Sequence, residues 1–132
     1  MKQLKLITFL CFPFLFLHTH LMYSQKRIKP PKKESKIDRV DLFVNKTFEV
    51  YNTVFTFDSL TSKGIEIHDK YEDAFIEKTQ KDAELLYELI PEMVEEASEA
   101  SVLKQAKATA NLNKARKAMT FCVKFFKDYI LE

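Results

Sequence analysis

Residues 36–132 contain very few residues that interrupt helices: one glycine, Gly64, and one proline, Pro91. A sheet protein turns about every 8–12 residues, and glycine and proline supply many of those turns. Their scarcity argues against a sheet and favours long helices. It also leaves little material for the glycine-rich loop that binds phosphate groups in nucleotide-dependent enzymes.

Side chains that are typical of active sites are equally rare. After residue 25 the only histidine is His68 and the only cysteine is Cys122, which rules out an internal disulfide. His68 and Glu72 are four residues apart and could share a metal ion, but a solvated helix start accounts for them more simply. The sequence has no nucleophile elbow, metalloprotease motif or paired-cysteine motif. We expect a protein without catalytic activity, metal or cofactor, in which Cys122 is a buried, inert thiol.

The first 25 residues have the order of a secretory signal peptide. Lys2 and Lys5 precede an apolar run over 6–17, and a small residue, Ser24, ends the segment. The run is much shorter than the roughly 20 apolar residues that span a bilayer. We expect export, to the periplasm or out of the cell, with cleavage after Ser24. A retained N-terminal membrane anchor is the alternative.

No net charge remains once residues 1–25 are set aside, because 21 − 2 = 19 basic residues then balance 19 acidic ones. Nonspecific binding to nucleic acid gains its affinity from neutralised phosphates and needs a basic excess. The balance therefore argues against a nucleic-acid partner. The remaining chain is long enough to bury one modest core.

Three segments make up the expected organisation: a signal peptide over 1–25, a basic linker over 26–35 and a helical bundle domain over 36–132. Pro30 and Pro31 exclude helix from the linker and favour an extended, solvated chain. The domain is predicted to be all-α, a small antiparallel bundle of three long helices. Their expected ranges are 36–60, 67–101 and 102–131.

Apolar residues at alternating three- and four-residue steps define one face of each expected helix. The stretch 43–57 is rich in β-branched and aromatic residues, which favour strands, but its period and its lack of turn residues favour a helix. The expected inner faces are Ile37, Val40, Val44, Thr47, Tyr51 and Val54 in the first helix; Tyr71, Phe75, Thr79, Ala83, Leu86 and Ile90 in the second; and Ala108, Leu112, Ala115, Met119, Cys122, Phe126 and Tyr129 in the third.

The helix ends carry their own signals. Gly64 follows the first helix, where a left-handed residue is wanted. Asp69 with Glu72 resembles a capping box at the start of the second helix. Pro91 is expected to kink or break that helix, because a proline inside a helix removes a hydrogen bond and crowds the preceding turn.

The second and third expected helices carry net charges of opposite sign. Residues 65–101 hold twelve acidic and three basic side chains, whereas residues 102–132 hold seven basic and two acidic ones. We expect the two helices to lie antiparallel with their charges paired, which aligns them more than it stabilises them. The basic helix then has its counter-charge within the chain, so that a membrane contact is not favoured. The residues expected to pair are Glu84, Glu88 and Glu95 with Lys107, Lys114 and Lys117.

Two further features bear on packing and binding. Asn111 lies beside the third inner face and is expected to fix register through a hydrogen bond, with Thr47 or Thr79 as candidate partners. The first helix is apolar over most of its circumference, so that aromatic residues either fill the core or form an exposed binding patch. The candidate interaction surface consists of Phe43, Val50, Phe57, Phe121 and Phe125.

The sequence favours an exported, non-catalytic helical-bundle protein that acts through protein–protein interaction in the cell envelope or outside the cell. Its partner is an unknown protein or a second copy of the chain. One alternative is a carrier or chaperone-like binder of apolar ligands or unfolded chains. Another is a peripheral membrane-surface protein held by the basic linker and the third helix.

Overall fold

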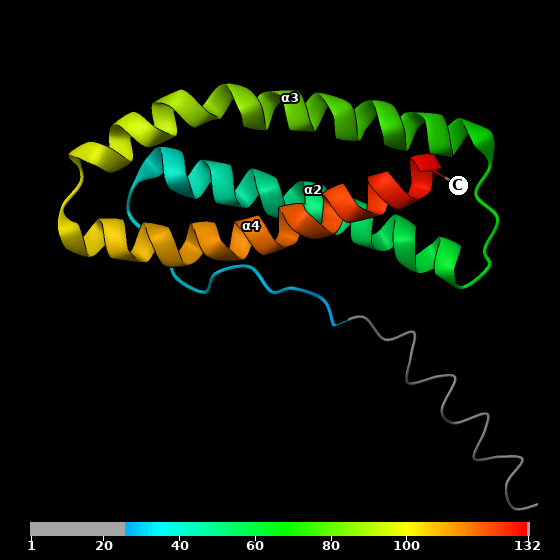
Figure 1. Ribbon diagram of the computed structural model, residues 1–132, viewed down its shortest axis with the longest axis horizontal. Coiled ribbons are helices and arrows are strands. Elements are labelled where there is room, and N and C mark those ends of the chain that lie inside the picture. Colours follow the sequence, from blue (N-terminus) through cyan, green and yellow to red (C-terminus); the bar gives the residue numbers. More distant parts are fainter. Residues whose placement is uncertain (1–25, 132) are drawn as a thin grey trace, which may run out of the picture.

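The computed structural model describes residues 26–131, which form three helices (Figure 1). Helix α2 spans Asp38–Ser62, α3 spans Asp69–Glu99 and α4 spans Val102–Leu131. No strand occurs between residues 26 and 131. The prediction of an all-helical fold with three long helices is confirmed. The predicted signal peptide lies outside the described residues.

Helix α2 is the centre of the bundle. It packs along both α3 and α4, whereas α3 and α4 contact each other only sparsely. In Figure 1, α3 runs antiparallel to α2, and the C-terminal part of α4 crosses α2 towards the first half of α3. This arrangement differs from the expected pairing of the second and third helices. The most apolar helix takes the position between the other two, because there it buries the largest part of its circumference.

The inner face expected for the first helix is confirmed, since all six of its residues are buried. Helix α4 contributes small side chains to the same core: Ala108, Ala115, Ala118 and Cys122 are buried. Small residues let α4 approach α2 closely. The larger members of its expected face, Leu112, Met119, Phe126 and Tyr129, are partly buried against the core.

The inner face expected for the second helix is partly wrong. Tyr71, Ala83 and Ile90 are exposed, and the buried residues of α3 are Phe75, Thr79, Leu86 and Met93. Half-buried Asp82 and Leu89 complete this line at alternating steps of three and four residues. Because the prediction followed apolar residues, it included Ala83 in place of its neighbour Asp82. The predicted face is therefore rotated around the helix relative to the buried one.

The end of α2 follows the prediction for Gly64. Its φ is +72°, its N–H donates to the Thr61 carbonyl at 3.0 Å, and the N–H of Ile65 donates to the Leu60 carbonyl at 3.1 Å. These two bonds form a Schellman motif, which satisfies carbonyl groups that the helix end leaves free. The left-handed glycine cap is confirmed.

Of two other expectations about helix structure, one differs from the structure and one is tested only in part. The N-cap of α3 is His68, whose Nδ1 accepts a hydrogen bond from the N–H of Lys70 at 3.3 Å, so that Asp69 does not lead a capping box. Helix α3 is one continuous helix that includes Pro91, so it is not broken there. The bend predicted in its axis stays a prediction.

Candidate functional site

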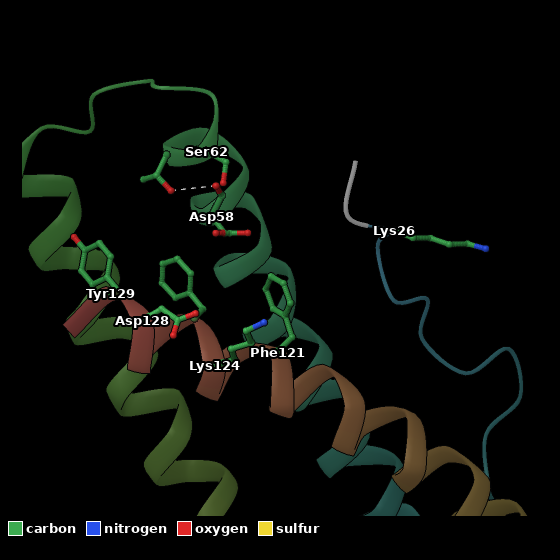
Figure 2. A pocket seen from close by; sticks show the side chains of 9 residues that line it. Lys26, Asp58, Ser62, Phe121, Lys124, Asp128 and Tyr129 are labelled. Atoms are coloured by element: carbon green, nitrogen blue, oxygen red, sulfur yellow. Dashed lines mark hydrogen bonds between the residues drawn. The ribbon is translucent and has the colours of Figure 1, made fainter. Parts of the chain in front are cut away.

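A cleft lies where the C-terminal ends of α2 and α4 meet (Figure 2). It has a volume of about 590 Å³. Asp58 and Ser62 come from the last turns of α2, and Phe121, Lys124 and Tyr129 come from α4. The complete lining is Lys26, Asp58, Thr61, Ser62, Phe121, Lys124, Phe125, Asp128 and Tyr129.

The lining combines both signs of charge with aromatic rings. Burial raises the pKa of the Asp58 carboxyl above its ordinary value. Lys124 supplies an ammonium group, and Asp128 supplies a second carboxylate. Such a set can hold a ligand that has an apolar body and a polar group, because the rings contact the body while the charges orient the group.

The aromatic wall of the cleft is fixed by rings beneath it. The ring centroid of Phe125 lies 5.9 Å from that of Phe57 and 5.5 Å from that of Tyr129. Phe57 in turn stacks on Phe75 of α3 at 4.0 Å. Helices α2, α3 and α4 therefore meet in one aromatic cluster, and the cleft lies on its surface.

The five residues of the candidate interaction surface do not lie on one exposed face. Val50 and Phe57 are buried in the core, and Phe43, Phe121 and Phe125 are half-buried against it. Phe121 and Phe125 line the cleft. The structure thus uses most of these side chains for packing.

The six residues of the expected charge pairs are all exposed, but they do not pair within residues 26–131. The ion pair that links α3 to another helix joins Glu92 to Arg39 of α2 at 3.1 Å. None of the five ion pairs in the described part of the chain includes a basic residue of α4. The six expected residues therefore face solvent, whereas Glu77 and Asp82 of α3 pair with lysines of the same helix.

Asn111 binds a partner that the sequence did not indicate. It is only 9% exposed, and its Nδ2 donates to the backbone carbonyl of Lys33 at 2.9 Å. Thr47 and Thr79, the expected partners, donate instead to carbonyls within their own helices. Asn111 thus fixes the linker to α4.

Residues 26–37, which we name the N-terminal strap, are held on the bundle rather than solvated on all sides. The N–H of Ile28 donates to the Tyr51 hydroxyl at 2.8 Å. The Arg27 guanidinium donates to Asn52 at 2.8 Å and lies 5.3 Å from the Phe55 ring centroid. Ser35 is fully buried, and both its N–H and its hydroxyl donate to Asp41. Backbone groups make several of these contacts, which explains why composition alone predicts a free linker.

Reactive and metal-binding groups are few in the described part of the chain. Cys122 is buried, and burial raises the pKa of its thiol to about 11, which keeps it protonated at neutral pH. Within residues 26–131, no group of three His, Cys, Asp or Glu side chains is placed to hold a metal ion. In the same range, no helix combines the length and the hydropathy that crossing a bilayer requires.

Comparison with known proteins adds no assignment. No family model, curated protein or solved structure matches this chain. The candidate sites therefore depend on the geometry alone.

One exposed feature of α3 was missed by the sequence reasoning. Ile76, Tyr87, Ile90 and Val94, which we name the apolar stripe, lie within about 60° of one another on a helix of 3.6 residues per turn. Tyr87 is 78% exposed and Val94 is 57% exposed. The signal was present in the sequence as a second heptad-like spacing, 76, 83, 87, 90 and 94, beside the buried one. Two such spacings on one helix predict two contact faces, of which the bundle covers one.

Proposed function

We propose that the protein is a non-catalytic interaction protein that binds a protein partner through the outer surface of α3. The apolar stripe carries this proposal, since large exposed apolar side chains at regular spacing are typical of a contact face. Tyrosine is also enriched at protein interfaces, and Tyr87 is the most exposed member of the stripe.

Site-specific photo-crosslinking in the cell that makes the protein tests this function. A crosslinking amino acid at position 87 of the full chain is expected to give adducts with protein, because that side chain would lie inside the interface. The same amino acid at position 45, an exposed site on α2, is the control. Abundant adducts from position 45, or none from position 87, would contradict the proposal.

The cleft in Figure 2 supports a second candidate function, a carrier of apolar ligands that have an anionic group. Phe121, Phe125 and Tyr129 would contact the apolar body, and Lys124 would attract the anion. Titration with an anionic apolar dye tests this function by fluorescence. We expect Lys124→Glu to weaken binding and Lys104→Glu, at the far end of α4, to leave it unchanged. Equal loss in both variants would point to nonspecific attraction.

Export is part of the same proposal. The order of residues 1–25, with basic residues, an apolar run and a small residue before Gln25, supports a cleaved signal peptide. N-terminal sequencing of the protein recovered from outside the cytoplasm is expected to begin at Gln25. A mature protein that still begins at Met1 would favour the retained anchor instead.

A further inference from the structure

Helix α3 presents an acidic row directly beside the apolar stripe. Four exposed glutamates occupy nearly one line along the outside of the helix, and one of them, Glu77, also forms an ion pair with Lys81 of the same helix at 2.7 Å. Each of them follows a small or apolar residue in the sequence, as in Ile76–Glu77, Tyr87–Glu88 and Val94–Glu95. We name this row the acidic stripe, and its members are Glu77, Glu84, Glu88 and Glu95.

Helix α4 presents a basic row of the same length. Its members, which we name the basic stripe, are Lys107, Lys114, Lys117 and Lys124, and all four are exposed. The N-terminal strap places further basic residues nearby, because Asn111 binds the Lys33 carbonyl between Lys107 and Lys114 on the same side of α4. This side of the molecule is therefore strongly basic.

The two stripes are turned away from each other within one chain. The side of α4 that meets α3 is marked by Gln105, whose Nε2 donates to the Ala97 carbonyl at 2.9 Å, and by Phe126, which stacks on Phe75 at 5.8 Å. Asn111 and the strap lie on another side of α4, and the four lysines of the basic stripe lie at least about 100° around the helix from both Gln105 and Phe126. Lys107 and Lys114 lie four residues before and three residues after Asn111, and so share its side. In Figure 1 the strap accordingly runs along the side of α4 that is remote from α3.

The spacings of the stripes nevertheless match. From Glu77 to Glu95 the steps along α3 are 7, 4 and 7 residues. In the reverse direction, from Lys124 to Lys107, the steps along α4 are 7, 3 and 7 residues. The one-residue difference corresponds to about 1.5 Å of rise and about 100° of rotation, so the four lysines spread over about 100° of α4 and reach one line only through their long side chains. An antiparallel contact would thus match the four pairs in height along the two helices, and the lysine side chains would bend to reach the glutamates.

We infer that the partner of the α3 surface is a second copy of this chain, whose basic stripe lies antiparallel along the acidic stripe. The register pairs Glu77 with Lys124, Glu84 with Lys117, Glu88 with Lys114 and Glu95 with Lys107. The apolar stripe lies at the edge of this contact and supplies buried surface. This inference rests on the proposed function and names its partner.

Other occupants explain less of the surface. A contact between two copies of α3 would bury the apolar stripe but would place acidic stripes side by side, and like charges oppose association. An anionic membrane could bind the basic stripe, but it would leave the acidic and apolar stripes without a role. A second copy brings the acidic and basic stripes together and covers the apolar stripe at their edge.

Charge reversal in two matched variants tests the inference on the purified protein. One variant carries Glu84→Lys, Glu88→Lys and Glu95→Lys, and the other carries Lys107→Glu, Lys114→Glu and Lys117→Glu. Each variant alone is expected to self-associate about tenfold more weakly than the unmodified protein, because like charges then meet in the contact. An equimolar mixture of the two is expected to associate again, since every pair has regained opposite signs. Sedimentation velocity measures the masses, and circular dichroism checks that each variant is folded.

A control variant distinguishes the effect of the paired positions from the effect of the protein's net charge. It carries Glu49→Lys, Glu66→Lys and Asp69→Lys, which are exposed positions outside the two stripes. We expect this variant to self-associate as the unmodified protein does. Added salt should weaken association of the unmodified protein, because its ion pairs are exposed.

Three results would overturn the inference. The first is an unmodified protein that stays monomeric at all concentrations. The second is an equal loss of association in the control variant. The third is a monomer that binds vesicles of anionic lipid through the basic stripe alone, which would indicate a membrane instead. Adducts from position 87 to a different protein, with a monomeric mass in solution, would preserve the proposed function while rejecting the second copy as the partner.

Discussion

Helices α2 and α3 are both long, yet they use their length differently. Helix α2 buries eight residues within 25 positions, whereas α3 buries four within 31. The surface of α3 that the bundle does not use carries regularly spaced apolar and acidic side chains. Helix α2 thus holds the fold together, and α3 leaves most of its surface exposed.

Two tyrosines, one on each helix, provide the strongest test of this comparison. Tyr51 of α2 is 1% exposed, and Tyr87 of α3 is 78% exposed. Replacing a large buried aromatic by alanine costs about 3–5 kcal/mol, so Tyr51→Ala should lower the free energy of unfolding by about that amount. Tyr87→Ala should change it by less than about 0.5 kcal/mol. Urea denaturation measures both values.

Tyr51→Phe refines the same test. It keeps the ring but removes the hydroxyl that accepts the N–H of Ile28. A loss of about 1 kcal/mol is expected, as for one hydrogen bond. If Tyr51→Ala and Tyr87→Ala lowered the free energy of unfolding by the same amount, α3 would be as important to the fold as α2.

The second prediction concerns a residue of α3 that stabilises α2. The first turn of α2 has no side-chain cap of its own, and the Glu96 carboxylate accepts the N–H groups of Asp38 and Arg39 at 3.2 and 3.0 Å. Glu96→Ala should therefore cost about 1 kcal/mol, as the loss of a helix cap does. Glu99→Ala, on the exposed end of α3, serves as the control and should be close to neutral. A neutral Glu96→Ala would show that water caps α2 equally well.

The sequence predicted α2 better than α3, and the reason is physical. The apolar period of α2 is long and unbroken, so it outweighs the strand preference of its β-branched residues. The buried line of α3 passes through Asp82, a charged residue whose carboxylate pairs with Lys78, and a search for apolar residues does not follow it. Composition showed that α3 is acidic and α4 basic, but it did not show that α2 would lie between them.

The contacts of the N-terminal strap were beyond prediction for a different reason. Prolines and lysines predict an extended chain, and residues 26–36 are indeed without helix. What holds the strap is a set of backbone groups, such as the Lys33 carbonyl and the Ile28 N–H. Every residue has these groups, so no pattern of side chains reveals which of them will find a partner.

The third prediction compares two residues that have a positive φ: Gly64, between α2 and α3, and Lys36, just before α2. Both Gly64 and Lys36 have a left-handed backbone, with φ of 72° and 66°. Gly64→Ala should cost about 1 kcal/mol through backbone strain alone, because no atom lies within 4 Å of the added Cβ. Lys36→Gly should have the opposite sign and stabilise the protein by about 0.5 kcal/mol. In thermal unfolding, the melting temperature of Gly64→Ala should lie below that of the unmodified protein and the melting temperature of Lys36→Gly above it. Shifts of the same sign in both variants would contradict this explanation.

The smallest expected effect concerns Asp58, which lies near the C-terminal end of α2 and lines the cleft. Burial raises the pKa of Asp58, so the folded state holds that proton more tightly than the unfolded chain does. Ionised Asp58 therefore destabilises the fold above its folded-state pKa, and this penalty disappears as the pH falls below the ordinary aspartate value of about 3.9. Its position about one turn before the C-terminal end of α2 adds an unfavourable interaction with the negative end of the helix dipole.

Asp58→Asn should accordingly raise the melting temperature slightly at neutral pH, and the gain should shrink as the solution is acidified. Asp128→Asn, on the other wall of the cleft, is the matched control, because it removes a similar charge from an exposed position. A gain for Asp58→Asn that persists at low pH would mean that shape rather than charge limits stability there. A gain of the expected kind would show that α2, although it holds the fold together, keeps one destabilising carboxylate on the wall of the cleft.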